Sequence, residues 1–176
     1  MRSEQSAICI WKGYSVQEEI RLKPIGVIHS AYQQQNGTPI QPSLSGDSVG
    51  WVEVFPEFEE GLADLEGFER LWLIYRLDRS NPDCPLRVKP YLDDREHGVF
   101  ATRSPSRPNL LGLSCVRLNG REGRRLDITG LDILDGSPLL DIKPYVPKFD
   151  SFAVERVGWF ARTLPDEVRA DDRFSK

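Results

Sequence analysis

Two arginines lie in a segment whose backbone is held by prolines and a glycine. Arg103 and Arg107 belong to Gly98–Asn109, with the sequence GVFATRSPSRPN. A guanidinium presents a planar fork of donors that binds a carboxylate or phosphate through two parallel hydrogen bonds. Residues 87–125 hold nine basic and four acidic residues, in a chain of net charge −4. The segment is therefore either an anion-binding, nucleic-acid-facing loop or a rigid loop with ordinary surface arginines.

A second candidate site combines carboxylates with a lysine and a tyrosine. Asp132, Asp135, Asp141, Lys143 and Tyr145 fall within 14 positions, across an expected strand–turn–strand unit. A carboxylate positioned beside a reacting group can act as a general base. Asp135 has an alternative role, because Asp-Gly favours turns in which the Asp side chain bonds the local backbone. Asp132 and Asp141 have the alternative of surface ion pairs, but the density of the cluster favours an active-site wall.

Short strands separated by glycine- and proline-rich turns must position these two segments. Strand-like composition recurs at residues 25–30, 49–55, 71–75, 99–102, 113–118, 126–134 and 139–142. The run 71–75 is almost continuously apolar, which is typical of a strand buried on both faces. Residues 33–46 are rich in Gln, Asn, Gly, Pro and Ser and predict a long loop. The pattern indicates a mainly β protein, an antiparallel β-barrel or sandwich with short helical additions.

Two segments show the spacing of amphipathic helices. In Pro56–Gly67, a proline opens the segment, acidic residues occupy the first turn, and Gly67 stands at the C-terminal cap position. The other begins at Ser151, with apolar side chains at 152, 154, 157, 160 and 164, and we expect it to dock on the body or on a second subunit. The predicted organisation is an N-terminal extension (1–20), a β-barrel domain (21–150) and a C-terminal helical tail (151–176).

Several functional classes lack their sequence signatures. The 176 residues contain no GxGxxG fingerprint, no GxxxxGK[ST] loop and no GxSxG elbow. Two histidines and three scattered cysteines predict neither a metal centre nor a disulfide framework. No apolar run approaches the ~18 residues of a membrane span, and the N-terminus lacks a signal peptide's apolar region. We therefore expect a soluble protein of the reducing cytoplasm, with no metal and no membrane partner.

Eight stretches together resemble the TsaA-like (TrmO-type) family of tRNA methyltransferases. They occur in the family's order from about residue 24 to residue 150: Pro24–Ser30, Gln41-Pro42, Gly61–Phe68, Leu71-Trp72, Gly98–Pro105, Arg107–Asn109, Gly112–Ser114 and Leu131–Tyr145. The blocks VFATRSPSRPN and DILDGSPLLDIKPY are the most specific. The chain departs from the family in placing Asp78 where many members have a histidine, and Leu110 where they have a proline.

The resemblance implies a small β-barrel that binds S-adenosylmethionine without a Rossmann sheet. It also implies a homodimer that methylates N6 of N6-threonylcarbamoyladenosine, beside the anticodon of threonine-accepting tRNA. Carried over by motif, the residues expected to line the cofactor pocket are Gln41, Pro42, Ser43, Asp78, Arg79, Arg103, Leu113, Asp132, Ile133, Leu134 and Asp135. Arg107 and Asn109 are expected to contact the substrate.

For the reaction, N6 must attack the methyl carbon in line while it loses a proton. Its lone pair is shared with the purine ring and the carbamoyl group, so a general base would help, and Asp135 and Asp141 are the candidates. Lys143 and Tyr145 would orient the carbamoyl oxygens. Two alternatives remain at this point: a non-catalytic module that binds S-adenosylmethionine or RNA, and a methyltransferase acting on a small molecule or another substrate.

Overall fold

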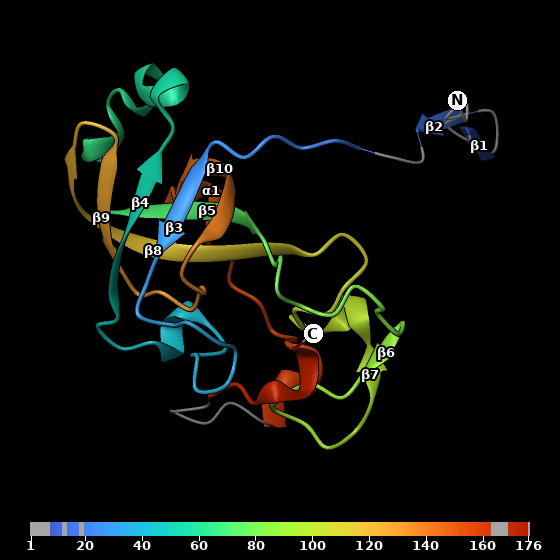
Figure 1. Ribbon diagram of the computed structural model, residues 1–176. Helices are drawn as coiled ribbons and strands as arrows, with labels where there is room; N and C mark the ends of the chain where they lie inside the picture. The colour runs from blue at the N-terminus through green and yellow to red at the C-terminus, as the bar shows by residue number, and fades with distance from the viewer. Residues whose placement is uncertain (1–7, 12–13, 18–19, 163–168, 176) are drawn as a thin grey trace.

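Six antiparallel strands close into a barrel in the order β10-β3-β4-β9-β8-β5 (Figure 1). The structure is a computed structural model that describes residues 8–11, 14–17, 20–162 and 169–175. The barrel strands are β3 (Gly26–His29), β4 (Val49–Val54), β5 (Arg70–Arg76), β8 (Leu111–Glu122), β9 (Arg125–Thr129) and β10 (Ser137–Pro144). The prediction of a mainly β barrel with few helices is confirmed, and a sandwich is not formed.

The barrel interior is filled by side chains that alternate along each strand, as strand geometry requires. In β5, Leu71, Leu73 and Tyr75 are buried, whereas Trp72 and Ile74 on the other face are half-buried. The prediction that this strand is buried on both faces is therefore wrong. Its outer face receives only partial cover, and the neighbouring strands β8 and β10 provide the backbone pairing on its two sides.

Strand ends differ from the predicted boundaries where turns are tighter than expected. The β8–β9 hairpin closes at Gly123, whose φ of 56° lies in the left-handed region that glycine tolerates without strain. Both strands therefore extend into residues 119–125, which lie between the predicted strands 113–118 and 126–134. Strand β9 stops at Thr129, so Leu131–Leu134 does not continue the strand as predicted. Instead it forms an irregular segment over one end of the barrel.

The predicted helix at Pro56–Gly67 is wrong in type. The segment forms two short 3₁₀ helices, η2 (Pro56–Leu62) and η3 (Leu65–Gly67). Asp64 between them has a φ of 65°, which an α-helix cannot accommodate. The apolar spacing still has its packing role, because Leu62 and Leu65 are buried in the barrel core.

Two further predicted elements are corrected. Residues 99–102 form a 3₁₀ turn, η4 (Val99–Ala101), rather than a strand. The C-terminal segment is not an amphipathic helix: α1 spans only Pro147–Asp150, residues 151–157 have no helical structure, and η5 spans Gly158–Arg162. Phe152, Val154 and Val157 are exposed, and a short helix whose apolar face is not buried is marginal in water. Leu164 lies outside the described residues.

Two pairs of short strands and two short helices lie outside the barrel. Strands β1 (Ile8–Trp11) and β2 (Tyr14–Gln17) form a hairpin that Figure 1 shows outside the barrel. Strands β6 (Arg87–Val88) and β7 (His97–Gly98) pair beside the loops at one barrel end. The other short helices are η1 (Pro42–Leu44), within the long polar loop, and η6 (Asp172–Phe174). In the described part of the chain, no helix has the length and apolar composition needed to span a membrane.

Candidate functional site

A cavity of about 560 Å³ opens at the end of the barrel where β5 finishes and β8 and β10 begin. We name it the donor cavity, after the methyl donor that the resemblance predicts. It is enclosed by four irregular segments: the polar loop at 38–41, residues 77–80 after β5, the arginine loop at 102–109, and residues 132–134 after β9. Its volume lies within the range of small-molecule sites. Ten predicted site residues line it: Gln41, Asp78, Arg79, Arg103, Arg107, Asn109, Leu113, Asp132, Ile133 and Leu134.

The arginine loop and the polar loop are joined across the cavity mouth. Arg103 Nη1 donates a hydrogen bond to Gln41 Oε1, over a sequence separation of 62 residues. The arginine loop is itself held by buried hydroxyl groups: Thr102 Oγ1 donates to the Val99 carbonyl at 2.8 Å, and Ser106 Oγ donates to the Asn81 carbonyl at 2.9 Å. This fixed backbone leaves the exposed Arg103 side chain at the mouth of the cavity.

Three polar side chains from three elements form a chain inside the cavity wall. Ser114 Oγ donates to Asp132 Oδ1 at 2.6 Å, and the Tyr75 hydroxyl lies 3.2 Å from Ser114 Oγ. Tyr75 and Ser114 are buried, and Asp132 keeps only partial exposure. Because Asp132 lines the cavity, its carboxylate is the charged end of this chain that a bound molecule would meet.

Burial raises the pKa of Asp132 to about 7, although the hydrogen bond from Ser114 and the positive charge of Arg103 act in the opposite direction. The residue retains some solvent-accessible area, yet protein atoms surround most of its carboxyl group, so the cost of desolvating the charge dominates. Burial and the Asp132 charge likewise raise the pKa of Tyr75 well above its ordinary value. Tyr75 is therefore neutral, while Asp132 changes its charge near neutral pH.

Arg79 has an unsatisfied donor beside the cavity. Its two terminal nitrogens donate to the carbonyl oxygens of Asp135 and Gln33. Its Nε is buried and forms no hydrogen bond within the described residues, since Asp78 Oδ1 lies 3.9 Å away. A buried N–H without an acceptor costs free energy. An acceptor atom on a bound molecule would remove this cost.

Asp135 does not line the donor cavity. Its carboxylate accepts hydrogen bonds from the Ser30 backbone N–H at 3.1 Å and from Gln33 Nε2 at 3.3 Å, and His29 Nδ1 lies 3.3 Å away. Partial burial raises the pKa of Asp135, but these hydrogen bonds outweigh it and the net pKa is lowered. Asp135 thus anchors the segment after β3. The sequence alone shows no carboxylate partner for His29, because the two residues are 106 positions apart.

Five other predicted residues also lie outside the lining of the donor cavity. Asp141 and Lys143 form an ion pair with each other at 2.8 Å, on the part of β10 that continues away from Ser137. Tyr145 packs against Trp72 with ring centroids 5.8 Å apart. Pro42 and Ser43 belong to η1, and Ser43 faces a second groove described below. The structure therefore places these five residues outside the cavity that Asp132 lines.

Sequence reasoning missed Tyr75 and Ser114. Ser114 is a polar residue on the inward face of β8, where its neighbours Val116 and Leu118 are apolar, and this is a signal for a buried hydrogen bond. Tyr75 ends the apolar run of β5, and its ring packs so closely on Gly112 that a Cβ there would lie 2.3 Å from the ring. Glycine at position 112 is what allows Tyr75 to reach Ser114.

The side chains of the cavity fit a cosubstrate that carries both positive and negative groups, with a net positive charge, such as S-adenosylmethionine. The Asp132 carboxylate can face a cationic group, and the guanidinium of Arg103 and the unsatisfied Nε of Arg79 can serve a carboxylate or hydroxyl group. Leu113 and Ile133 supply apolar surface for a purine ring. The described residues contain no cluster of three or more His, Cys, Asp or Glu side chains able to hold a metal ion.

Comparison with known proteins agrees with this geometry. The family described as tRNA-methyltransferase O N-terminal domain matches residues 27–151. A probable S-adenosyl-L-methionine-binding protein of Pyrococcus abyssi is 50% identical over 154 residues, which cover 86% of this chain and 83% of that protein. The human tRNA (adenine(37)-N6)-methyltransferase is 36% identical over 135 residues, covering 73% of this chain and 31% of the human protein.

A solved structure shares the fold as well. The crystal structure of TrmO from Pseudomonas aeruginosa superposes with a TM-score of 0.71 at 39% identity, covering 84% of this chain and 65% of that one. The chain thus spans just under two thirds of that structure and about a third of the human relative. On the family match, the sequence identities and the shared barrel, this chain belongs to the tRNA-methyltransferase O family.

Proposed function

We propose that this protein transfers a methyl group from S-adenosylmethionine to N6 of N6-threonylcarbamoyladenosine, beside the anticodon of a threonine-accepting tRNA. The observation that supports this most directly is the donor cavity, where a buried carboxylate and two arginines meet at one end of a non-Rossmann barrel. Family membership supports both the methyl donor and the tRNA acceptor.

S-adenosylmethionine supplies an electrophilic methyl group on a sulfonium centre. The residues of this chain hold the reactants and accept one proton. As N6 forms its bond to the methyl carbon, the carbon–sulfur bond breaks, and the N6 proton must leave. We assign this proton to Asp132, because it is a cavity carboxylate with a pKa of about 7, which suits a base at neutral pH. Ser114 orients the Asp132 carboxylate.

This assignment replaces Asp135 and Asp141 as the proposed base. The Asp135 carboxylate already has three hydrogen-bond partners, and Asp141 is paired with Lys143 at the barrel surface. Neither faces the donor cavity of its own chain. Lys143 and Tyr145 share the location of Asp141, so orienting the carbamoyl oxygens would require them to act in a cavity of a second subunit.

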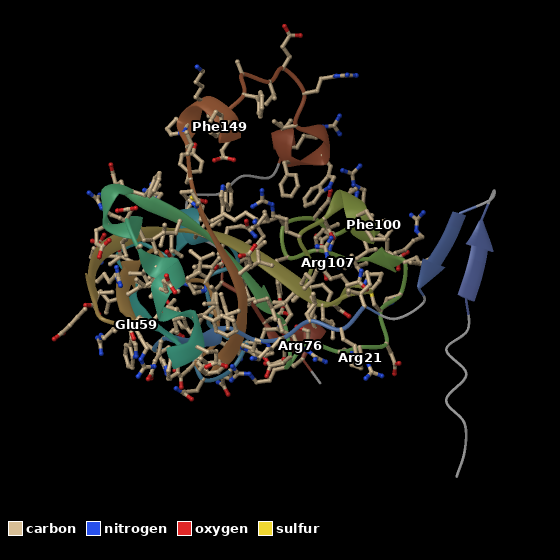
Figure 2. All side chains as sticks on the ribbon, turned by 90° about the horizontal axis from the view of Figure 1, so that it is seen from above. Arg21, Glu59, Arg76, Phe100, Arg107 and Phe149 are labelled. Atoms are coloured by element: carbon tan, nitrogen blue, oxygen red, sulfur yellow. The ribbon has the colours of Figure 1, made fainter. Side chains whose placement is uncertain are left out.

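The proposed assembly is a cytoplasmic homodimer. Its support is the row of exposed apolar side chains at Phe149, Phe152 and Val154, on a segment that projects from the barrel (Figure 2). Such surface is unusual on a monomer. Sedimentation of the purified chain tests this part independently of the reaction.

The deciding experiment incubates the protein with isotopically labelled S-adenosylmethionine and total tRNA, and then separates the nucleosides by mass spectrometry. The expected product is N6-methyl-N6-threonylcarbamoyladenosine, at a level that falls at least a hundredfold in Asp132→Asn. Donor binding by calorimetry without methylated nucleoside would instead indicate a non-catalytic binding module. Label in a small molecule but not in tRNA would indicate a different acceptor.

A further inference from the structure

A second groove of about 340 Å³ adjoins the donor cavity. The two share Ile40, Gln41, Tyr91, Arg103 and Ser104, so Arg103 stands at their junction. The far wall of the groove comes from the C-terminal segment, through Val157, Trp159 and Phe160. These three residues follow the range 27–151 matched by the family, so the resemblance assigns them no role.

The groove wall contains a continuous pile of aromatic rings. Trp159 stacks on His97 with ring centroids 4.6 Å apart and an interplanar angle of 18°, and on Phe160 at 3.9 Å and 24°. Trp159 Nε1 donates to the Ala101 carbonyl at 2.8 Å, which fixes the indole beside the arginine loop. Trp159 and Phe160 remain only half-buried. A rigid aromatic surface of this kind can accept a further flat ring.

The charged residues in and near the groove indicate which kind of flat ligand it would bind. Arg103 is the single charged residue among the described residues that line it, and none of them is acidic. Arg156 and Arg162 flank the aromatic pair in sequence, and neither forms an ion pair within the described part of the chain. Stacking surfaces combined with basic side chains are the usual means of binding single-stranded nucleic acid.

We propose that this groove is a stacking subsite for an unpaired tRNA nucleotide next to the methylated one, with Phe160, the outer ring of the pile, as its platform and Trp159 as the ring that supports it. The inference rests on the proposed function and extends it. The nucleotide base lies against the free face of Phe160, and Arg103 stands between this base and the donor cavity. The groove therefore places the acceptor loop, while the barrel binds the methyl donor.

The test compares Phe160→Ala with Trp51→Ala, which removes a ring from a stacked pair elsewhere in the protein. Trp51 stacks on His29 with ring centroids 4.8 Å apart and an interplanar angle of 18°, but lines neither cavity. A fluorescently labelled anticodon stem–loop RNA is titrated with each protein, and S-adenosylmethionine binding is measured in parallel. Loss of base–aromatic stacking weakens binding by roughly 5- to 150-fold. We expect Phe160→Ala to lose at least tenfold in RNA affinity, with donor affinity within twofold and RNA affinity of Trp51→Ala unchanged.

A third variant, Phe160→Tyr, keeps a flat aromatic face at this position. It should recover most of the RNA affinity and the KM for tRNA. The inference is overturned if Phe160→Ala binds RNA as the wild type does, if Phe160→Tyr is as defective as Phe160→Ala, or if Phe160→Ala dissociates a dimer. A wild-type protein that neither binds nor methylates tRNA would overturn the proposed function itself, which is a distinguishable result.

Discussion

Replacing Asp132 by Asn should stabilise the protein at neutral and alkaline pH while it abolishes methylation. Asparagine keeps the shape of the side chain and can accept the hydrogen bond from Ser114, but it carries no charge to be buried. Burial raises the pKa of Asp132 from 3.8 to about 7, a factor of roughly 10³ in proton affinity. At about 1.36 kcal/mol for each factor of ten, this corresponds to an upper value of roughly 4 kcal/mol.

The sign of the pH dependence follows from the raised pKa. Below pH 3.8, Asp132 is protonated in both the folded and the unfolded chain, and it costs no stability. Between 3.8 and about 7, the unfolded chain ionises while the folded chain holds its proton, so the stability of the wild type falls as pH rises. Above about 7 the penalty is constant. Water in the cavity screens part of it, so we expect an advantage of about 2–4 kcal/mol for Asp132→Asn at pH 8.

Urea unfolding followed by tryptophan fluorescence measures this advantage, as the difference between the two proteins from pH 4.5 to 8.5. Taking the difference removes the contribution of every other titrating group. Asp141→Asn is the control: Asp141 is half-exposed and paired with Lys143, so its loss should change stability by less than about 0.5 kcal/mol. A stability difference between wild type and Asp132→Asn that does not vary with pH would refute the buried, ionisable carboxylate.

Three further changes test neighbouring contacts. Ser114→Ala removes the hydrogen bond that lowers the pKa of Asp132, so the acid limb of the pH–kcat profile should move to higher pH; an unmoved limb would contradict Asp132 as the base. Asp135→Asn should cost about 1–2 kcal/mol of stability above pH 4, measured by urea unfolding, and the loss should disappear as pH falls through the lowered pKa of Asp135. Arg103→Lys should weaken donor binding about tenfold by calorimetry, because lysine lacks the planar fork that reaches Gln41; unchanged affinity would place Arg103 outside the donor site.

The barrel could be predicted from the sequence because its signals are local. Alternating apolar residues and glycine turns mark strands such as β4 and β9 without knowledge of their neighbours. The C-terminal tail could not be predicted in this way. Its apolar spacing is helical, yet Phe152 and Val154 are exposed, and periodicity alone does not stabilise a short helix.

The donor cavity, too, could be predicted only in part from the sequence. Resemblance placed Asp132 and Arg103 at the cofactor site, but it could not reveal the environment that sets their chemistry. Tyr75, Ser114 and Asp132 come from β5, β8 and the segment after β9, and only the closed barrel brings them into one chain of polar groups. Resemblance also placed Asp135 at the cofactor site, but the structure gives it another role. Its contacts with His29 and Ser30, more than 100 residues away, anchor the segment after β3.

A carboxylate that lowers the stability of its own fold needs a compensating role. Asp132 could be replaced by Asn or Leu without loss of the barrel core, which the apolar residues of β4, β5 and β9 supply. The burial that makes the charge costly also raises the pKa into the range where a group both accepts and releases a proton at neutral pH. Asp135, stabilised by three hydrogen bonds, gains stability and loses that capacity. The two aspartates of one short segment therefore have different roles: Asp135 holds the segment in place, and Asp132 accepts the proton of the reaction.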